Sequence, residues 1–221
     1  MNLENQYGDE RSMQELIEKA VKFNDAKTIY NRVAIIYDES DHKDKAEMIY
    51  NFMIKKFYSD ISTWISFLLF YMKNNQIEKG RKLFVKALAS IEKRQHIDLI
   101  SKFAQFEFCY GDYENGKTLF EKLLALYWER LDKWSIYIDM LIKYTLKDDD
   151  DDDHRNDAIE FIRNIFERLL TFKFSPHKMR FIFKKYYDFE MKYSCNNDDD
   201  LLERLKQKAA EYVEHGKIVS N

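Results

Sequence analysis

Large apolar residues recur along this sequence in sets of three, and the distance between successive sets is nearly constant. Within each set the residues stand three positions apart, which is the spacing of one helix face. The sets begin at Tyr30, Trp64, Ile100, Trp134 and Phe183, so the intervals are 34, 36, 34 and 49 residues. A near-constant interval of this kind indicates a chain built from copies of one structural unit.

A second series of aromatic residues has the same period. It consists of Tyr50, Phe84, Phe120 and Phe166, which are 34, 36 and 46 residues apart. Both series lengthen at the same place, which indicates two alternating helices in every repeat. A period near 34 residues with two helices is typical of tetratricopeptide-like (TPR-like) solenoids. The sequence therefore predicts an all-α fold, a TPR-like solenoid of about five antiparallel helix pairs plus an N-terminal helix.

The expected helix bounds follow from these registers and from the polar turns between them. The N-terminal helix is expected over 10–23. The pairs are expected over 25–37 and 43–57, 62–74 and 76–91, 95–110 and 113–127, 131–146 and 156–171, and 176–193 and 201–217. Residues 1–9 and 218–221 are expected to be tails, so one repeat domain spans 10–217. Five Gly and one Pro in 221 residues suit helices joined by short turns.

The lengthened interval contains six consecutive aspartates, Asp148–Asp153. A run of like charges repels itself and does not pack. We therefore expect a solvated loop, inserted at about 147–155 between the two helices of the fourth pair. Calcium binding is the alternative, but calcium loops need spaced ligands and a glycine at the turn. Asn196–Asp200 is expected to form a second polar turn.

Small residues stand four positions before the second-helix aromatic in three of the repeats. They are Ala46, Gly80 and Gly116. Glycine inside a helix costs about 1 kcal/mol relative to alanine, so its recurrence indicates close approach of two helices. Ile162 takes this position in the fourth pair, where a wider crossing is expected.

No constellation of residues typical of catalysis is found in the sequence. It has no Gly-rich phosphate loop, no His-x-x-x-His pair, no paired cysteine motif and no nucleophile elbow. The net charge of −3 gives no overall attraction for nucleic acid. No uncharged stretch is long enough to span a bilayer. We expect a protein that is not an enzyme, with no cofactor, no metal, no membrane partner and no small-molecule substrate.

One stretch concentrates basic residues without any acid. Phosphate contact needs clustered Lys and Arg, which release condensed counterions. The candidate contacts for RNA or an acidic partner are Lys173, Lys178, Arg180, Lys184 and Lys185. The alternative is a solvated face that is balanced by the acidic loops nearby.

The recurring aromatic side chains could be read as platforms for base stacking. Their period matches repeat packing, so we expect them to form the core instead. This predicted core consists of Trp64, Phe67, Phe84, Phe103, Phe106, Phe120, Trp134, Tyr137, Phe166, Tyr186 and Phe189.

With these residues in place, the sequence resembles HAT arrays, the half-a-TPR repeats of RNA-processing proteins. Their first helix carries two aromatic residues three apart, followed by an apolar–Glu pair. Phe103, Phe106 and Glu107 fit this pattern, as do Tyr186, Phe189 and Glu190, and Trp134 with Tyr137 fits its aromatic part. Their second helix ends in a phrase like Ile-Phe-Glu-Arg-Leu, which Ile165–Leu169 matches and Leu119–Leu123 approaches.

Longer phrases resemble one family in particular. KFAQFEFCYGDYENGKTLFEKLL, KWSIYIDMLIK, IRNIFERLL and PHKMRFIFKKYYDFEMKY are similar to the carboxy-terminal domain of the ribosomal RNA processing protein five family, also called programmed cell death protein eleven. The resemblance runs from about residue 12 to about residue 215. It implies a scaffold of the early pre-ribosome in the nucleus and nucleolus, needed for small-subunit rRNA maturation. The implied partners are proteins of the small-subunit processome and pre-rRNA.

Two other functions fit the same fold. HAT arrays also occur in splicing and mRNA 3′-end processing complexes, so the scaffold would then belong to another RNA-processing machine. A TPR-like module can instead be a peptide-binding adaptor, which needs a Lys/Asn/Arg clamp for a terminal carboxylate. The resembling family carries S1 RNA-binding domains ahead of this region, and none lies in these residues. The chain is therefore expected to be part of a longer protein or a free-standing array.

Overall fold

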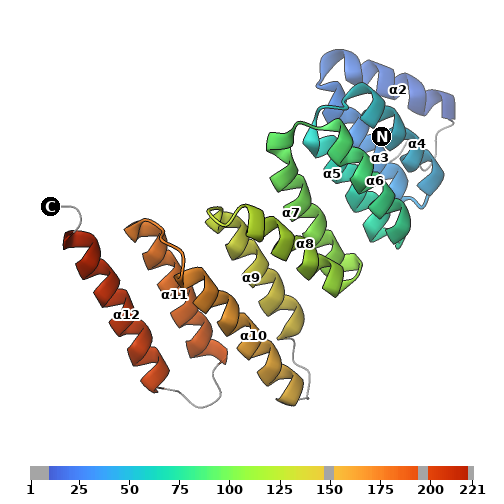
Figure 1. Cartoon of the computed structure of the whole chain (residues 1–221). Coiled ribbons are helices and arrows are strands. Elements are labelled where there is room, and N and C mark those ends of the chain that lie inside the picture. Colours follow the sequence, from blue (N-terminus) through green and yellow to red (C-terminus); the bar gives the residue numbers. More distant parts are fainter. Residues whose placement is uncertain (1–9, 147–151, 194–198, 219–221) are drawn as a thin grey trace. The chain divides into compact units, whose positions relative to one another are not determined.

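The computed structural model describes residues 10–146, 152–193 and 199–218, and all regular secondary structure in these ranges is helical (Figure 1). The chain divides into two compact units, Met1–Leu123 and Leu124–Asn221, and the division falls in the last turn of α8. The predicted all-α repeat fold is confirmed.

The first unit contains α2 to α8 and the second contains α9 to α12. In the first unit the helices are α2 (Glu10–Phe23), α3 (Ala26–Glu39), α4 (Lys43–Lys56), α5 (Ile61–Lys73), α6 (Ile77–Ser90), α7 (Lys93–Tyr110) and α8 (Tyr113–Leu126). In the second they are α9 (Leu131–Thr145), α10 (Asp152–Leu170), α11 (Pro176–Tyr193) and α12 (Asp199–Ile218). Each predicted helix is present, and α2 and α11 have the predicted bounds.

The turn between the two helices of a pair repeats along with the helices. Asp41 in the α3–α4 turn and Asn75 in the α5–α6 turn have positive φ angles of 60° and 58°. Asp and Asn tolerate this left-handed conformation better than other side chains because their short polar groups bond locally. The two residues stand 34 positions apart, so the turn has the same period as the aromatic series.

The core is a series of stacked aromatic rings that join consecutive pairs. Every residue of the core predicted from the aromatic series is buried. The second-helix aromatic of one pair stacks on the first helix of the next pair: Tyr50 on Phe67 at 5.2 Å, Phe84 on Phe103 at 4.2 Å and Phe166 on Tyr186 at 4.6 Å between ring centroids. Ring planes within 6–11° of parallel show offset stacking at each of these steps.

The tryptophans are anchored alike in both units. The indole N–H of Trp64 donates to the carbonyl of Tyr58 at 2.7 Å, and that of Trp134 donates to the carbonyl of Trp128 at 2.9 Å. Both acceptors lie six residues upstream, in the turn before the helix. Each indole therefore fills the core and ties down the incoming turn with its one polar group.

The predicted close helix crossings occur at the two glycines. A Cβ atom at Gly116 would lie 2.7 Å from Cδ2 of Phe108 and 3.1 Å from the carbonyl oxygen of Ala104, both on α7. A Cβ atom at Gly80 would lie 2.8 Å from Sδ of Met72 on α5. The wider crossing expected at Ile162 stays a prediction.

The C-terminal bound predicted for the acidic loop is wrong. Helix α10 begins at Asp152, so residues 152–155 are helical, and α12 likewise begins at Asp199 rather than at Leu201. Aspartates in a first helical turn are favoured by the partial positive charge of the helix N-terminus, and this overrides their tendency to end a helix. Asp148–Asp151 and residues 194–198 lie outside the described residues.

Candidate partner-binding surface on α11

Helix α11 is strongly two-sided. It begins at Pro176, where a proline costs no hydrogen bond, and the backbone N–H of Met179 donates to the carbonyl of Ser175 at 2.9 Å. Its inner face is buried and consists of Met179, Ile182, Tyr186, Phe189 and Glu190. Its outer face begins with four exposed residues at the helical spacing i, i+3, i+4 and i+7. These four, called here the α11 stripe, are His177, Arg180, Phe181 and Lys184.

Four of the five basic residues predicted as contacts are exposed in the structure. Lys173 lies in the α10–α11 turn, Lys178 in the first turn of α11, and Arg180 and Lys184 in the α11 stripe. Within the described ranges, no carboxylate forms an ion pair with any of these four residues. The ammonium of Lys178 lies 5.6 Å from the ring centroid of Phe174. The structure therefore brings together a group of cations that no acid neutralises by direct contact.

Lys185 differs from the other four. Its ammonium lies 2.8 Å from a carboxylate oxygen of Asp139 and donates to the carbonyl and hydroxyl oxygens of Ser135, at 3.1 and 2.6 Å. Both partners belong to α9, so Lys185 joins two first helices of consecutive pairs. Lys185 therefore stabilises the packing of α11 against α9 within the second unit. It does not belong to the exposed surface that the other four basic residues share.

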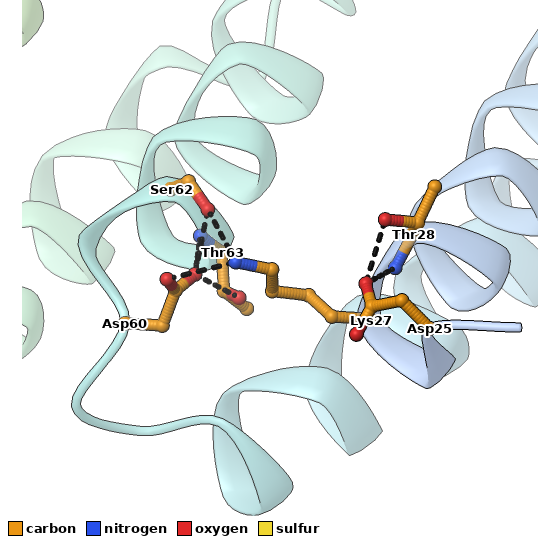
Figure 2. Close-up of polar contacts among 6 residues, drawn as sticks. All are labelled: Asp25, Lys27, Thr28, Asp60, Ser62 and Thr63. Carbon is orange, nitrogen blue, oxygen red and sulfur yellow. Dashed lines mark hydrogen bonds and ion pairs between the residues drawn. The ribbon is translucent and has the colours of Figure 1, made fainter.

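Cations at the corresponding place in the first unit are neutralised. Lys27 of α3 donates to Asp60 Oδ1 at 3.0 Å and to the hydroxyl of Ser62 at 3.4 Å, as Figure 2 shows. Asp60 caps α5 and also accepts the backbone N–H of Thr63 at 2.9 Å. Burial would raise the pKa of Asp60, but the hydrogen bonds from Ser62, Lys27 and Thr63 lower it to about 2. The charge of Lys27 thus faces a carboxylate that stays ionised near neutral pH.

The start of α9 follows the same plan. Arg130 donates two hydrogen bonds to Asp132, at 2.9 and 2.8 Å, and the ammonium of Lys133 lies 3.4 Å from the same carboxylate. The hydrogen bonds from Arg130 lower the pKa of Asp132 to about 2 against the opposing effect of burial. Basic residues that begin α3 and α9 therefore have acidic partners, and within the part of the chain that the structure describes those of the α11 stripe do not.

Comparison with known proteins identifies the family. The sequence model of the Suppressor of forked protein (Suf) family matches residues 10–220. The chain belongs to the Suppressor of forked family. The match covers every described helix, and it confirms the HAT-type resemblance drawn from the aromatic–Glu phrases.

Several relatives of this Suf-family chain are named for ribosomal RNA. It is 36% identical over 213 residues to the rRNA biogenesis protein rrp5 of Schizosaccharomyces pombe and 35% identical over 214 residues to the Protein RRP5 homolog of Mus musculus. It is 32% identical over 214 residues to the rRNA biogenesis protein RRP5 of Arabidopsis thaliana. These alignments cover 96–97% of this chain but 10–12% of the relatives, so the chain spans about a tenth of their length.

The sequence pattern missed the cationic halves of two buried ion pairs. Arg81 of α6 donates to Glu107 of α7 from Nε and Nη2, at 2.9 and 3.0 Å. Arg163 of α10 donates to Glu190 of α11 in the same two-pronged way, at 2.9 and 2.7 Å. Hydrogen bonding to these carboxylates raises the pKa of both arginines, against the opposing effect of burial. We call these two ion pairs the Arg–Glu clamps.

A signal for the clamps was present in the repeat register. Arg81 stands three residues before Phe84, and Arg163 stands three residues before Phe166, so both occupy one position of the second helix. Their partners are the glutamates of the HAT phrases. Each clamp fastens the second helix of one pair to the first helix of the next, and the second clamp thereby fixes the helix that carries the α11 stripe.

The described part of the chain exposes charged side chains on α11. Among its residues, no group of three or more His, Cys, Asp or Glu side chains is placed to hold a metal ion. No helix within the same ranges is long and apolar enough to cross a membrane. Exposed cations on a rigid helix can attract and orient an anionic partner, and this is the chemistry that the α11 surface supplies.

Proposed function

We propose that this chain is a non-catalytic interaction scaffold in rRNA processing and small ribosomal subunit biogenesis. One observation carries the proposal: two relatives that are named for rRNA biogenesis each align with 96% of this chain. Because the chain is about a tenth of their length, what it shares with them is the helical repeat region itself. The proposal therefore concerns what an array of helix pairs can do.

The mechanism is geometric. Helix pairs that contact only their neighbours present a long surface on which a partner can be held at several points. Here the stacked rings, the tryptophan anchors and the Arg–Glu clamps fix each helix pair, and the outer faces are left for partners. The proposed partners are proteins of the small-subunit processome, together with pre-rRNA, in the nucleus and nucleolus. The exposed cations of α11 support contact with an anionic partner.

Recovery of the tagged chain from its native cell tests this function. The chain would be isolated at moderate salt, and both the co-purifying proteins and the cross-linked RNA would be identified, with an untagged strain as the control. The expected result is small-subunit assembly factors together with pre-18S rRNA. Recovery of splicing or 3′-end processing factors, or of chaperones without RNA, would overturn the proposal and favour one of the two other scaffold functions.

A further inference from the structure

An exposed aromatic ring stands among the unneutralised cations of the α11 stripe. The side chain of Phe181 is 45% exposed, between Arg180 beside it and Lys184 one turn further along the helix. Within the described residues, no other ring contacts Phe181. Phe52, which is 43% exposed, packs edge-on against Tyr30 with 4.9 Å between the ring centroids, whereas Phe23 at the end of α2 is 86% exposed. The ring of Phe181 is therefore open to a partner.

The rest of α11 accounts for its own packing without the stripe. Tyr186 and Phe189 bury the inner face, and the clamp from Arg163 to Glu190 holds the helix against α10. Lys185 is occupied by Asp139 and Ser135 on α9. The ring contacts and ion pairs that hold α11 in the described structure thus do not involve Arg180, Phe181 or Lys184.

We propose that the α11 stripe binds single-stranded RNA, with phosphates on Arg180 and Lys184 and an unpaired base stacked on Phe181. Cations that lack a carboxylate partner attract phosphate and release its condensed counterions. A ring flanked by such cations supplies the other half of single-strand recognition, because any base can stack on it. A base inside a duplex is already stacked on both sides, so the ring selects single strands.

The spacing of the stripe suits this arrangement. Arg180 and Lys184 are four residues apart, which places their Cα atoms about 6 Å apart along the helix axis. This rise is comparable to the separation of successive phosphates in an extended strand. Lys173 and Lys178 extend the positive surface toward the α10–α11 turn, where a longer strand would continue. An acidic protein segment would satisfy the cations but would leave the ring without a specific role. The choice of RNA as the nucleic acid rests on the proposed function.

A titration of the purified chain with fluorescein-labelled oligouridylate tests the assignment, with the affinity followed by anisotropy at several salt concentrations. The double variant Arg180→Glu/Lys184→Glu should weaken binding at least tenfold. The magnitude of the log–log salt slope should fall by about 1.4, because each single-strand phosphate contact contributes about 0.7. The Phe181→Ala variant should weaken binding about fivefold to a hundredfold, the effect of losing one base–aromatic stack. Phe181→Trp should retain binding.

Helix α6 provides matched controls. Lys82 and Lys86 are exposed at the same i, i+4 spacing, and Val85 between them is 67% exposed. Lys82→Glu/Lys86→Glu changes the net charge as much as the α11 double variant, and Val85→Ala removes exposed apolar surface without removing a ring. Both should leave the affinity unchanged. Arg180→Gln/Lys184→Gln repeats the test without charge reversal, and circular dichroism verifies that each variant is folded.

Three outcomes would overturn the assignment. The first is no binding of oligouridylate, and the second is equal losses in the α6 and α11 double variants. The third is unchanged affinity of Phe181→Ala together with equal affinity for duplex RNA, which would reduce the stripe to a non-selective polyanion surface. The measurement uses purified chain and a defined probe, so a negative result leaves the co-purification from cells unaffected. Loss of the ribosomal partners in cells would likewise leave a positive titration standing.

Discussion

Lys27 of the first unit and Arg180 of the second occupy the same position of the repeat, three residues before the first aromatic of their sets. Lys27 is held by Asp60, the cap of the following first helix, and by Ser62 (Figure 2). Arg180 has no carboxylate partner among the described residues. The next positions diverge too, because Thr28 corresponds to Phe181 and Asn31 to Lys184. The same repeat position therefore holds an ion-paired lysine, Lys27, in the first unit and an exposed arginine, Arg180, in the second.

The framework beneath these positions is nearly the same in both units. Each has a tryptophan bound to a carbonyl six residues upstream, a second-helix aromatic stacked on the next pair, and an Arg–Glu clamp. Residues that hold the repeats together are thus repeated, whereas the unneutralised outer residues are not. This difference supports the proposal that a partner binds α11, where the outer cations have no ion pair within the described residues.

Truncation of the anchoring tryptophans should have the largest effect on stability. Trp64→Ala and Trp134→Ala should each lower the free energy of unfolding by about 3–5 kcal/mol, because each leaves a large cavity and an unpaired carbonyl. Trp134→Ala should cost more, since the guanidinium of Arg168 also lies 4.8 Å from the centroid of the Trp134 ring. Urea unfolding followed by circular dichroism measures both. A loss below about 1 kcal/mol in either variant would show that the frameworks are not equivalent.

Removal of the clamp arginines should have the next largest effect. Glu107 and Glu190 are almost fully buried, so Arg81→Ala and Arg163→Ala each leave a buried carboxylate without its cation, at a cost of about 3 kcal/mol. Arg163→Ala should cost more than Arg81→Ala. Glu107 keeps the backbone N–H of Asp112 at 3.0 Å, whereas Arg163 is the hydrogen-bond donor that the structure shows for Glu190.

A double-mutant cycle separates the clamp from the packing around it. Arg163→Met/Glu190→Leu replaces the ion pair with apolar groups of similar length and should recover most of the stability lost in Arg163→Ala. The same exchange at Arg81 and Glu107 is the matched control. If the double exchanges are as unstable as the single ones, the clamps contribute something other than the neutralisation of a buried charge.

The sequence was sufficient to predict the fold because the core is local and periodic. Trp64, Phe84 and Phe166 each stand in a register that recurs near 34 residues, and a solenoid buries what its register repeats. The helix starts at Asp152 and Asp199 do not follow from the self-repulsion of a run of aspartates. Its favourable interaction with a helix N-terminus acts in the opposite direction.

Less of the candidate surface could be predicted, because it depends on which charges are neutralised across helices. A basic stretch is visible in the sequence, but the sequence does not show that Asp139, 46 positions before Lys185, takes up that one lysine. The exposure of Phe181 was equally hidden, since Phe174 and Phe189 on either side of it in the sequence are buried. Both facts depend on the contacts of α11 with its neighbours and not on local pattern.

Loss of Asp60 should have a smaller effect on stability. Asp60→Ala removes the cap of α5 and the partner of Lys27, at a cost of about 1–2 kcal/mol. Asp60→Asn keeps a capping group but loses the charge. The pKa of Asp60 is lowered to about 2, below the value of about 3.9 of an unfolded chain, so the charged form stabilises the fold above the unfolded value. That contribution is lost as the pH falls through the folded value.

Urea unfolding at pH 7, 5 and 3 tests this pH dependence. The difference between the native chain and Asp60→Asn should be full at pH 7 and pH 5 and should shrink by pH 3, as the carboxylate begins to bind its proton. A difference that stays constant down to pH 3 would mean that the charge of Asp60 does not act through Lys27 and the α5 cap. Asp60 would then not act as the neutralising partner of Lys27.

Substitution of the α11 cations should have the smallest effect on stability, and this sets the two units apart most sharply. Arg180→Ala and Lys184→Ala should change the free energy of unfolding by less than about 0.5 kcal/mol, because neither side chain has an ion-pair partner among the described residues. Lys185→Ala on the same helix should cost about 1 kcal/mol, since it breaks the contacts with Asp139 and Ser135.

Losses in Arg180→Ala or Lys184→Ala as large as in Lys185→Ala would show that these cations serve the fold, and the contrast with Lys27 would disappear. A small effect on unfolding combined with a large effect on oligouridylate binding would show that Arg180 and Lys184 serve a partner and not the stability of the fold.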